Sequence, residues 1–480
     1  MGMEQAHYLN VNENQCGMCM PLGAILALKG VEGSMVIIHG SQGCSTYMRR
    51  HIAEHFNEPI DVASSSLNEK GTIYGGEASL KKGLDNSIKL YKPKVVGILT
   101  TCLAETIGED IDRIAADYLE ERGFENLQVV TVSTPGYGYS HFEGYFLAVK
   151  RVVAELVKKT VKHKGINIIV PNISPADIRE IKRILKMMKV SYILLPDFSD
   201  TLDRAFERPY RKVPAGGTKL ADIAGMAGAQ ATIQMGVTVD EVFSPGHYLE
   251  SAFGVPLYNV PVPIGVENTD LFINLLKRLT GNPVPESLER ERGRLIDCMI
   301  DSHKYNAQGK CVVFGEPENI YAVAGICLEN GITPVVTATG GKSGKLAGLL
   351  KARLNEAGCS NAQVLCETDF SRIREKSREM EANIAIGHSG GRYLTEWEGI
   401  PLVRYGFPIH DRVGGQRLLS VGYAGTTMLL DRITNTLLEN KYKNYRRNIY
   451  QQFYYGTIKP AGKGRGEKNE LRLQPGAKRV

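Results

Sequence analysis

Residues 33–44, GSMVIIHGSQGC, place an apolar, partly β-branched run directly before a glycine-bearing turn and a cysteine. Neither alternating face of this run is polar, which is typical of a strand buried on both sides in a parallel sheet. The same pattern recurs at KVVGILTT (94–101) and QVVTVSTPG (128–136), and a turn and a helical pattern follow each run. Strands that alternate with helices predict a doubly wound α/β unit, in which ligands bind beyond the carboxyl ends of the strands.

Two further series of strands and helices follow along the chain. The second starts at GINIIVPN (165–172), and SPADIREIKRILKMM (174–188) continues it with a serine N-cap and a proline at the first helical position. The third starts at GKCVVFGEPENIYAVAGICLENG (309–331). Because 480 residues are too many for one hydrophobic core, we predict several α/β domains. Their predicted boundaries are 1–162, 163–304 and 305–455, with a tail at 456–480.

The composition excludes several classes of function. With 43% hydrophobic and 23% charged residues, the chain has the composition of a soluble globular protein. No apolar run reaches the roughly 18 residues of a membrane span, and no basic region followed by an apolar core opens the sequence, so we predict a cytoplasmic protein without membrane contact. Much of the net charge of +6 lies in residues 459–480, where seven Lys and Arg face two Glu. We therefore expect a disordered basic tail and no nucleic-acid surface.

Four of the nine cysteines lie where α/β proteins bind ligands. Cys44 and Cys102 each follow a predicted strand, so both thiols should lie at one edge of a sheet, and the early loop with Cys16 and Cys19 can fold over that edge. A zinc site needs a second close pair of cysteines, and a redox pair needs a strand directly before it. Iron–sulfur clusters use scattered single cysteines and can be shared between subunits. We favour an iron–sulfur cluster, with zinc or unrelated thiols as the alternatives.

Other conspicuous residues are expected to be structural. Among the remaining five cysteines, Cys311 falls inside a predicted strand and Cys327 inside a predicted helix, which is typical of buried thiols. His388 and His410 lie singly beside turns, where a structural role is the simpler interpretation. ATGGKSGK (338–345) has glycine and lysine but lacks the Walker spacing GxxxxGK[ST], so we expect no nucleotide there.

Several long motifs, in order along the chain, resemble one family, that of nitrogenase component 1. They begin with CMPLGAILALKGVEGSMVIIHGSQGC and PKVVGILTTCLAETIGEDI and end with GHSGGRY and GIPLVRYGFPIHDR. The resemblance extends from about residue 16 to residue 440. It implies three Rossmann-like doubly wound parallel-sheet domains and an α2β2 heterotetramer that carries iron–sulfur clusters. The segments HGSQGC and TTCLAETIGED resemble the β-type chains of the family.

Two kinds of β-type chain differ in the cluster they hold. By resemblance, Cys19, Cys44 and Cys102 correspond to the cysteines that a catalytic nitrogenase β-chain gives to the [8Fe-7S] P-cluster, which relays electrons to the cofactor of the α-chain. In the β-type subunit of the scaffold on which the iron–molybdenum cofactor precursor matures, a cysteine aligned with Cys16 resembles a ligand of a [4Fe-4S] cluster. The resemblance therefore implies metal ligands among Cys16, Cys19, Cys44 and Cys102.

Three features favour the scaffold subunit. Only fifteen residues precede Cys16, Asn57-Glu58-Pro59 replaces the Arg-Glu-Pro of many catalytic chains, and Gly136 stands where a catalytic chain can have a cluster-binding serine. The presence of Cys102 argues against it, because scaffold chains often lack this cysteine. We expect a scaffold subunit in nitrogen fixation, with a catalytic nitrogenase or nitrogenase-like reductase β-chain as the alternative.

Both alternatives imply the same partners. These are an α-type subunit, which shares the cluster, and an ATP-dependent iron protein, which docks transiently. Neither alternative gives this chain an acid–base or nucleophilic residue of its own, so we expect no catalytic side chain in it.

Overall fold

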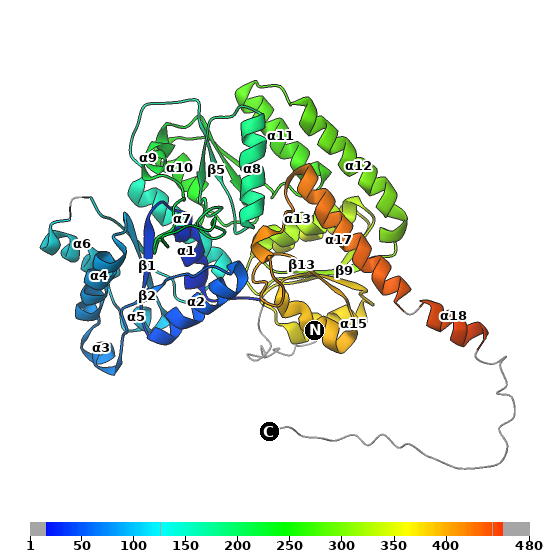
Figure 1. Ribbon diagram of the computed structural model, residues 1–480, viewed down its shortest axis with the longest axis horizontal. Helices are drawn as coiled ribbons and strands as arrows, with labels where there is room; N and C mark the ends of the chain where they lie inside the picture. Colours follow the sequence, from blue (N-terminus) through cyan, green and yellow to red (C-terminus); the bar gives the residue numbers. More distant parts are fainter. Residues whose placement is uncertain (1–15, 125, 444, 455–480) are drawn as a thin grey trace, which may run out of the picture. The chain divides into compact units, whose positions relative to one another are not determined.

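The computed structural model describes residues 16–124, 126–443 and 445–454. It divides the chain into two compact units, Met1–Leu437 and Leu438–Val480. The first unit contains three parallel β-sheets with helices packed against them (Figure 1). This architecture confirms the predicted α/β class with doubly wound parallel sheets. The disordered tail predicted at 456–480 lies outside the described residues.

The first sheet has the strand order β2-β1-β3-β4, and all of its strands are parallel. Its strands are β1 (Ser34–His39), β2 (Ala63–Ser64), β3 (Val95–Thr100) and β4 (Gln128–Val132). Six helices follow or connect these strands: α2 (Gln42–Phe56), α3 (Glu69–Tyr74), α4 (Glu77–Tyr91), α5 (Cys102–Thr106), α6 (Ile111–Arg122) and α7 (His141–Leu156). Every residue of β1 and β3 is buried, as their continuous apolar pattern predicts.

An additional helix, α1 (Met20–Lys29), precedes the first strand and is buried along its whole length. It packs against α7 at very short range because both helices have glycine at the contact. A Cβ on Gly23 would lie 1.7 Å from the carbonyl oxygen of His141, and one on Gly144 would lie 2.0 Å from that of Met20. This close contact holds the start of α1 beside the start of α7.

The second sheet has the order β6-β5-β7-β8 and is also parallel. Its strands are β5 (Ile166–Ile169), β6 (Tyr192–Leu195), β7 (Ala231–Met235) and β8 (Leu257–Val260), and its helices are α8 (Pro175–Met187), α9 (Leu220–Gly225), α10 (Pro245–Phe253) and α11 (Val266–Thr280). Helix α8 begins as predicted, with the Ser174 side chain accepting a hydrogen bond from the backbone of Asp177 and proline in the first turn.

The third sheet has the order β11-β10-β9-β12-β13 and is parallel throughout. Its strands are β9 (Lys310–Phe314), β10 (Thr333–Ala338), β11 (Gln363–Leu365), β12 (Ile384–Gly387) and β13 (Leu402–Arg404). The accompanying helices are α12 (Glu286–Asn306), α13 (Pro317–Glu329), α14 (Gly344–Glu356), α15 (Phe370–Glu379), α16 (Arg392–Glu398) and α17 (Gly422–Tyr442), and α18 (Tyr445–Phe453) follows them. Cys311 in β9 and Cys327 in α13 are fully buried, as expected for structural thiols.

The three sheets share one hydrophobic core. A single cluster of buried residues includes Val36 of β1, Ile168 of β5 and Val313 of β9. We keep the boundaries 1–162, 163–304 and 305–455 as a proposal for three α/β domains, since each sheet falls within one of these ranges. Across the part of the chain that the structure describes, no helix has both the length and the apolar character needed to span a lipid bilayer.

Candidate functional site

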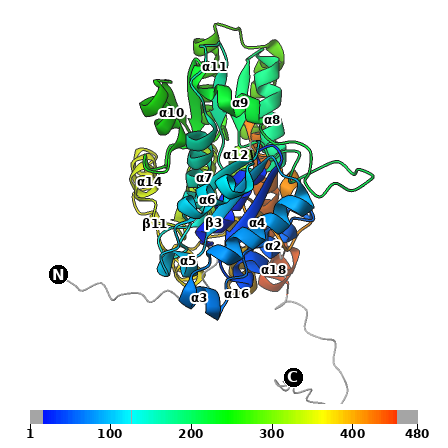
Figure 2. The same ribbon diagram turned by 90° about the vertical axis from the view of Figure 1, so that its left-hand side faces the viewer.

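Cys44 and Cys102 lie at the same edge of the first sheet. Strands β1 and β3 are neighbours in register, with His39 opposite Thr100, and each cysteine follows the carboxyl end of its strand. Cys44 lies in the first turn of α2, where it is partly exposed, and Cys102 is the exposed first residue of α5. The view in Figure 2 shows α3 and α5 at this end of the sheet. The expected meeting of the two thiols at one edge is therefore present.

Cys19 reaches this edge from the loop before α1. It is the N-cap residue of α1, it pairs with Ser140 in an isolated antiparallel bridge, and it is exposed. The backbone N–H of Gly136 donates a hydrogen bond of 3.2 Å to the Cys102 sulfur. A Cβ on Gly136 would lie 3.4 Å from the Cys102 sulfur and 3.5 Å from the Cys19 sulfur. The two sulfurs therefore face each other across a residue that has no side chain.

The three thiols influence one another electrostatically. Partial burial raises the pKa of the Cys19 thiol, and the neighbouring Cys102 and Cys44 raise this pKa further. Because three thiolates at one site repel each other, they need a cationic group between them. Within residues 16–124, 126–443 and 445–454, no three His, Cys, Asp or Glu side chains are arranged to hold a single metal ion. Three cysteine sulfurs from separate segments are the kind of donors that iron–sulfur clusters use.

Cys16 lies apart from the other three predicted ligands. Its side chain is 3% exposed and belongs to a hydrophobic cluster with Val312 and Phe314 of the third sheet. Burial raises the pKa of the Cys16 thiol well above its ordinary value, and the Asp369 carboxylate adds to this increase. Of the four predicted ligands, the structure thus brings together Cys19, Cys44 and Cys102 and keeps Cys16 in the core near the third sheet.

A polar pocket of about 280 Å³ adjoins Cys19. One wall is formed by residues 136–140, and the opposite wall is formed by Gly340, Gly341 and Lys342 of the loop after β10. Gly17 packs against this loop so closely that a Cβ on Gly340 would lie 2.3 Å from its nitrogen. The cysteine loop is therefore held between the first sheet and the third.

Several exposed aromatic side chains lie near Cys19. Tyr47 of α2 lies near Cys19, since burial and the charge of Cys19 both raise the pKa of its phenol. Tyr137 and Tyr139 line the pocket beside Cys19, and Ile73 and Tyr74 of α3 are exposed as well. In the sequence, these residues could have been found only as aromatic and aliphatic residues next to the cysteine motifs.

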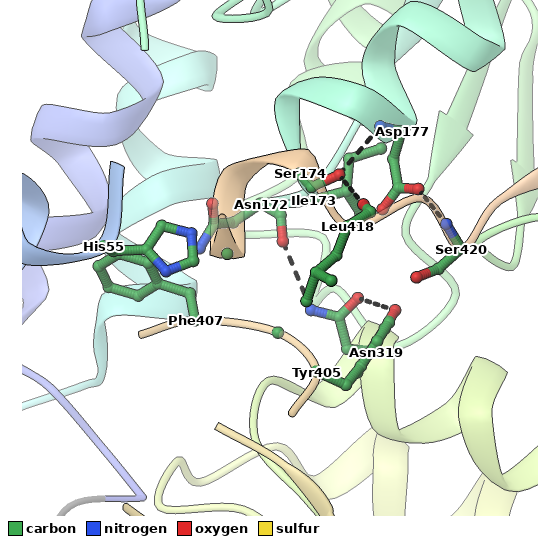
Figure 3. A pocket seen from close by; sticks show the side chains of 12 residues that line it. His55, Asn172, Ile173, Ser174, Asp177, Asn319, Tyr405, Phe407, Leu418 and Ser420 are labelled. Atoms are coloured by element: carbon green, nitrogen blue, oxygen red, sulfur yellow. Dashed lines mark hydrogen bonds between the residues drawn. The ribbon is translucent and has the colours of Figure 1, made fainter. Parts of the chain in front are cut away.

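A second cavity, of about 20 Å³, lies among residues of the second and third α/β ranges beside His55 of α2 (Figure 3). Asn319 donates a hydrogen bond to the backbone oxygen of Asn172 and accepts one from the Tyr405 hydroxyl, while Asp177 accepts one from the backbone of Ser420. Burial raises the pKa of Asp177 to about 6. This volume is sufficient for about one water molecule, so the cavity has no room for a metal cofactor.

His388 has the structural environment expected of it, whereas Nδ1 of His410 is buried with no hydrogen-bond partner among the described residues. His388 is fully buried between the rings of Phe314 and Phe370, and its Nδ1 accepts a hydrogen bond from the Gly390 backbone. Burial lowers the pKa of His388 to about 3, so the side chain is neutral. The backbone N–H of His410 donates to the Ser389 hydroxyl.

Glu58 is engaged within the chain. Its carboxylate accepts hydrogen bonds from the backbone nitrogen and from Nε of Arg204, at 3.2 and 3.0 Å. Both carboxylate oxygens of Glu58 are thus occupied by contacts within the chain.

The chain is similar to known nitrogenase proteins over most of its length. The family model for nitrogenase component 1 type oxidoreductases matches residues 19–438. The chain is 35% identical over 429 residues to the nitrogenase molybdenum-iron protein beta chain of Clostridium pasteurianum, covering 89% of this chain and 93% of that protein. It is 37% identical over 448 residues to the corresponding chain of Methanococcus maripaludis, covering 90% and 96%. The nitrogenase vanadium-iron protein beta chain of Trichormus variabilis is 34% identical over 448 residues, covering 90% and 95%.

Solved structures have the same fold. A chain of nitrogenase Cp1 at pH 6.5 superimposes with a TM-score of 0.87 and 34% identity, covering 96% of this chain and 98% of that chain. A chain of nitrogenase Cp1 at pH 5 superimposes with a TM-score of 0.68 at 15% identity, covering 92% and 91%, and shows a likeness of fold alone.

Proposed function

Because the chain belongs to the nitrogenase component 1 type oxidoreductase family, we propose that it is a nitrogenase β-chain whose Cys19, Cys44 and Cys102 hold one side of a P-cluster. The observation that carries this proposal is the convergence of these three thiols, from three separate segments, at one exposed edge of the first sheet. The cluster, when bound, supplies a store for electrons that pass to the cofactor of an α-type chain.

The position of Cys16 favours the catalytic alternative over the scaffold subunit. The scaffold interpretation uses Cys16 as a ligand, whereas this thiol is buried beside the third sheet, away from the other three. The relatives described above are also named as nitrogenase β-chains rather than as assembly proteins. These two observations support a P-cluster of the [8Fe-7S] type, and a [4Fe-4S] cluster of a scaffold is the competing outcome.

The exposure of the thiols supports an α-type partner. A cluster held only by Cys19 and Cys102, which are exposed, and Cys44, which is partly exposed, would be open to water on one side. The exposed rings of Tyr47, Tyr137 and Tyr139 also need a protein surface to cover them. We propose that an α-type subunit covers this face and supplies the remaining ligands in an α2β2 heterotetramer, on which an ATP-dependent iron protein docks transiently.

The work of this chain is to hold the sulfurs and to set their surroundings. The Gly136 N–H donates to the Cys102 sulfur, and hydrogen bonds to ligand sulfurs are one of the means by which proteins tune cluster potentials. The close packing of α1 on α7 fixes the start of α1, where Cys19 lies. No acid–base step is assigned to this chain, and its role does not depend on which metal the α-chain cofactor contains.

Substitution of single cysteines tests the ligand assignment. We expect Cys19→Ala, Cys44→Ala and Cys102→Ala each to lower the iron content of the anaerobically purified complex strongly. Cys16→Ala and the buried control Cys327→Ala should keep most of the iron, because both thiols lie in the hydrophobic core. Iron loss in Cys16→Ala as large as in Cys44→Ala would support the scaffold subunit instead, and equal iron in Cys44→Ala and Cys327→Ala would refute the assignment.

A further inference from the structure

His141, the first residue of α7, holds the residue before Cys19 at both of its backbone polar groups. The His141 backbone N–H donates to the carbonyl oxygen of Met18 at 2.8 Å. The ring nitrogen Nδ1 of His141 accepts a hydrogen bond from the Met18 N–H at 3.3 Å. The cysteine loop is thus attached to α7 by a side chain that is 123 residues away in the sequence.

The other ring nitrogen of His141 faces a buried carboxylate. Its Nε2 lies 2.8 Å from Oε1 of Glu316, and the two side chains are 5% and 3% exposed. Because Nδ1 accepts a hydrogen bond, Nε2 carries the ring proton, and it lies in close ionic contact with Glu316 without the alignment of a hydrogen bond. The imidazole is therefore held in one tautomer and one orientation.

Glu316 is itself fixed by residues of the second and third α/β ranges. Asn172 donates to its Oε1 at 2.8 Å, and Asn319 donates to its Oε2 at 3.3 Å. Both asparagines line the small cavity of Figure 3. Buried hydrogen bonds, together with the close contact between His141 and Glu316, thus connect the cysteine loop to this cavity.

We propose that His141 is a positioning residue for the Cys19 sulfur, and that Glu316 fixes the orientation of the imidazole. The positioning of Cys19 by His141 does not depend on the proposed function. Only its consequence, a cluster held in one geometry, rests on that function. Ligand sulfurs need partners that fix their position, since supporting residues of this kind determine metal affinity and potential. Cys44 and Cys102 lie in the first turns of helices that directly follow buried strands, whereas Cys19, the N-cap of α1, follows no strand, and His141 fixes the residue that leads into it.

The first test uses the full-length chain without iron and measures how fast iodoacetamide alkylates each cysteine, by mass spectrometry of its peptides. In His141→Phe, which keeps a ring but loses both contacts, we expect Cys19 to react about tenfold faster, because the loss of the hydrogen bond to the Met18 N–H lets the loop open more often. Cys44 and Cys102 in the same sample serve as internal references and should keep their rates. An unchanged ratio of the Cys19 rate to the Cys44 rate would overturn the proposal.

Tyr145→Phe is the matched control. It removes a buried hydrogen bond, from the Tyr145 hydroxyl to the backbone of Val170, from the same helix α7 without touching the cysteine loop. We expect the Cys19 rate to stay unchanged in this variant. Equal acceleration in Tyr145→Phe and His141→Phe would mean that any loss of stability in α7 exposes Cys19, which contradicts a specific positioning role.

Two smaller substitutions separate the two ring contacts and serve if His141→Phe does not fold. Asn at position 141 keeps an acceptor for the Met18 N–H, and Gln keeps a donor that reaches towards Glu316. We expect His141→Asn to retain most of the protection of Cys19 and His141→Gln to lose it. Equal Cys19 rates in these two variants would overturn the assignment of the Met18 contact.

The complex loaded with iron provides the second readout. We expect His141→Phe to shift the reduction potential and the EPR line shape of the cluster, and His141→Asn to restore both towards those of the wild type. A wild-type complex without iron would refute the proposed function, yet faster alkylation of Cys19 in His141→Phe would still support the positioning role. Unchanged potential and line shape in a loaded His141→Phe complex would overturn the positioning role alone.

Discussion

The backbone of Gly136 lies 3.2 Å from the Cys102 sulfur and donates a hydrogen bond to it, while the missing side chain of Gly136 leaves space between Cys102 and Cys19. This relationship joins the loop after β4 to the ligand that follows β3. It also explains why a residue without a side chain is suited to position 136. The backbone of Gly136 does not have a positive φ, so its conformation alone would not require glycine.

Gly136→Ala should reduce cluster binding without unfolding the chain. The added methyl group would make ordinary van der Waals contacts, at 3.4 and 3.5 Å, with the Cys102 and Cys19 sulfurs. We expect the free energy of unfolding of the iron-free chain to change by less than about 1 kcal/mol. The iron content of the complex should fall, because the methyl group occupies space between two ligands.

Gly138→Ala is the control for this prediction, since its Cβ would meet only the Pro135 carbonyl oxygen at 3.9 Å. We expect wild-type iron content in this variant. Full iron content in Gly136→Ala, measured beside it, would show that the space between the two sulfurs is not used by a bound group.

Gly23→Ala should destabilise the chain and displace Cys19. Its Cβ would lie 1.7 Å from the backbone oxygen of His141, so α1 and α7 would have to separate. We expect a loss of about 3 kcal/mol or more in the free energy of unfolding, as for severe overpacking, and a loss of iron from the complex. Denaturant unfolding and an iron assay measure the two effects.

Gly348→Ala in α14 is the control for this prediction. Its added Cβ would meet no atom within 4 Å, so no packing has to change. In a helix interior this change should stabilise the chain by about 0.5–1 kcal/mol. If Gly23→Ala were as stable as Gly348→Ala, the close packing of α1 on α7 described here would be wrong.

Stability should depend on pH through the buried carboxyl group of Glu318. Burial raises its pKa from 4.5 to about 7, although Thr238 donates two hydrogen bonds to one of its oxygens. The folded chain therefore holds more protons than the unfolded chain between these pH values, and the free energy of unfolding falls as the pH rises from 4.5 to about 7. The contribution is about 3 kcal/mol. It is complete below pH 4.5 and is lost above pH 7.

Glu318→Gln removes this contribution and leaves the other titrating groups in place. Asp177, whose pKa is also raised, and His55 and His388, whose pKa values are lowered to about 3, contribute equally to both proteins. We therefore expect the difference in the free energy of unfolding between wild type and Glu318→Gln to vary with pH from 4.5 to 7. A difference that stays constant over this range would contradict the raised pKa.

The sequence was sufficient for the fold and for the position of two of the predicted ligands at one sheet edge. Buried strands such as 33–40 and 94–101 have an unmistakable apolar pattern, and the parallel order of their strands brings Cys44 and Cys102 to one edge. Spacing alone did not separate Cys16 from Cys19, because both lie in the same loop. Their separation depends on where α1 begins and on the contact of Gly17 with Gly340, which is remote in the sequence.

The role of His141 had no local signal. Its two ring contacts, with Met18 and Glu316, join residues more than one hundred positions apart, so no pattern of neighbouring residues indicates them. A scaffold subunit would use Cys16 as a ligand, and the buried position of this thiol favours the catalytic alternative instead. In both cases the packing of distant segments, rather than residue type, decides the function of the side chain.

The central claim is tested most directly by an iron count and EPR spectroscopy of the complex with its α-type partner, purified without air and reduced with dithionite. A β-chain of the proposed kind predicts about eight irons per αβ pair in the shared cluster, silent in the reduced state and paramagnetic after oxidation. A paramagnetic four-iron cluster in the reduced state, with about half as much iron at this site, would contradict the P-cluster and identify the scaffold subunit.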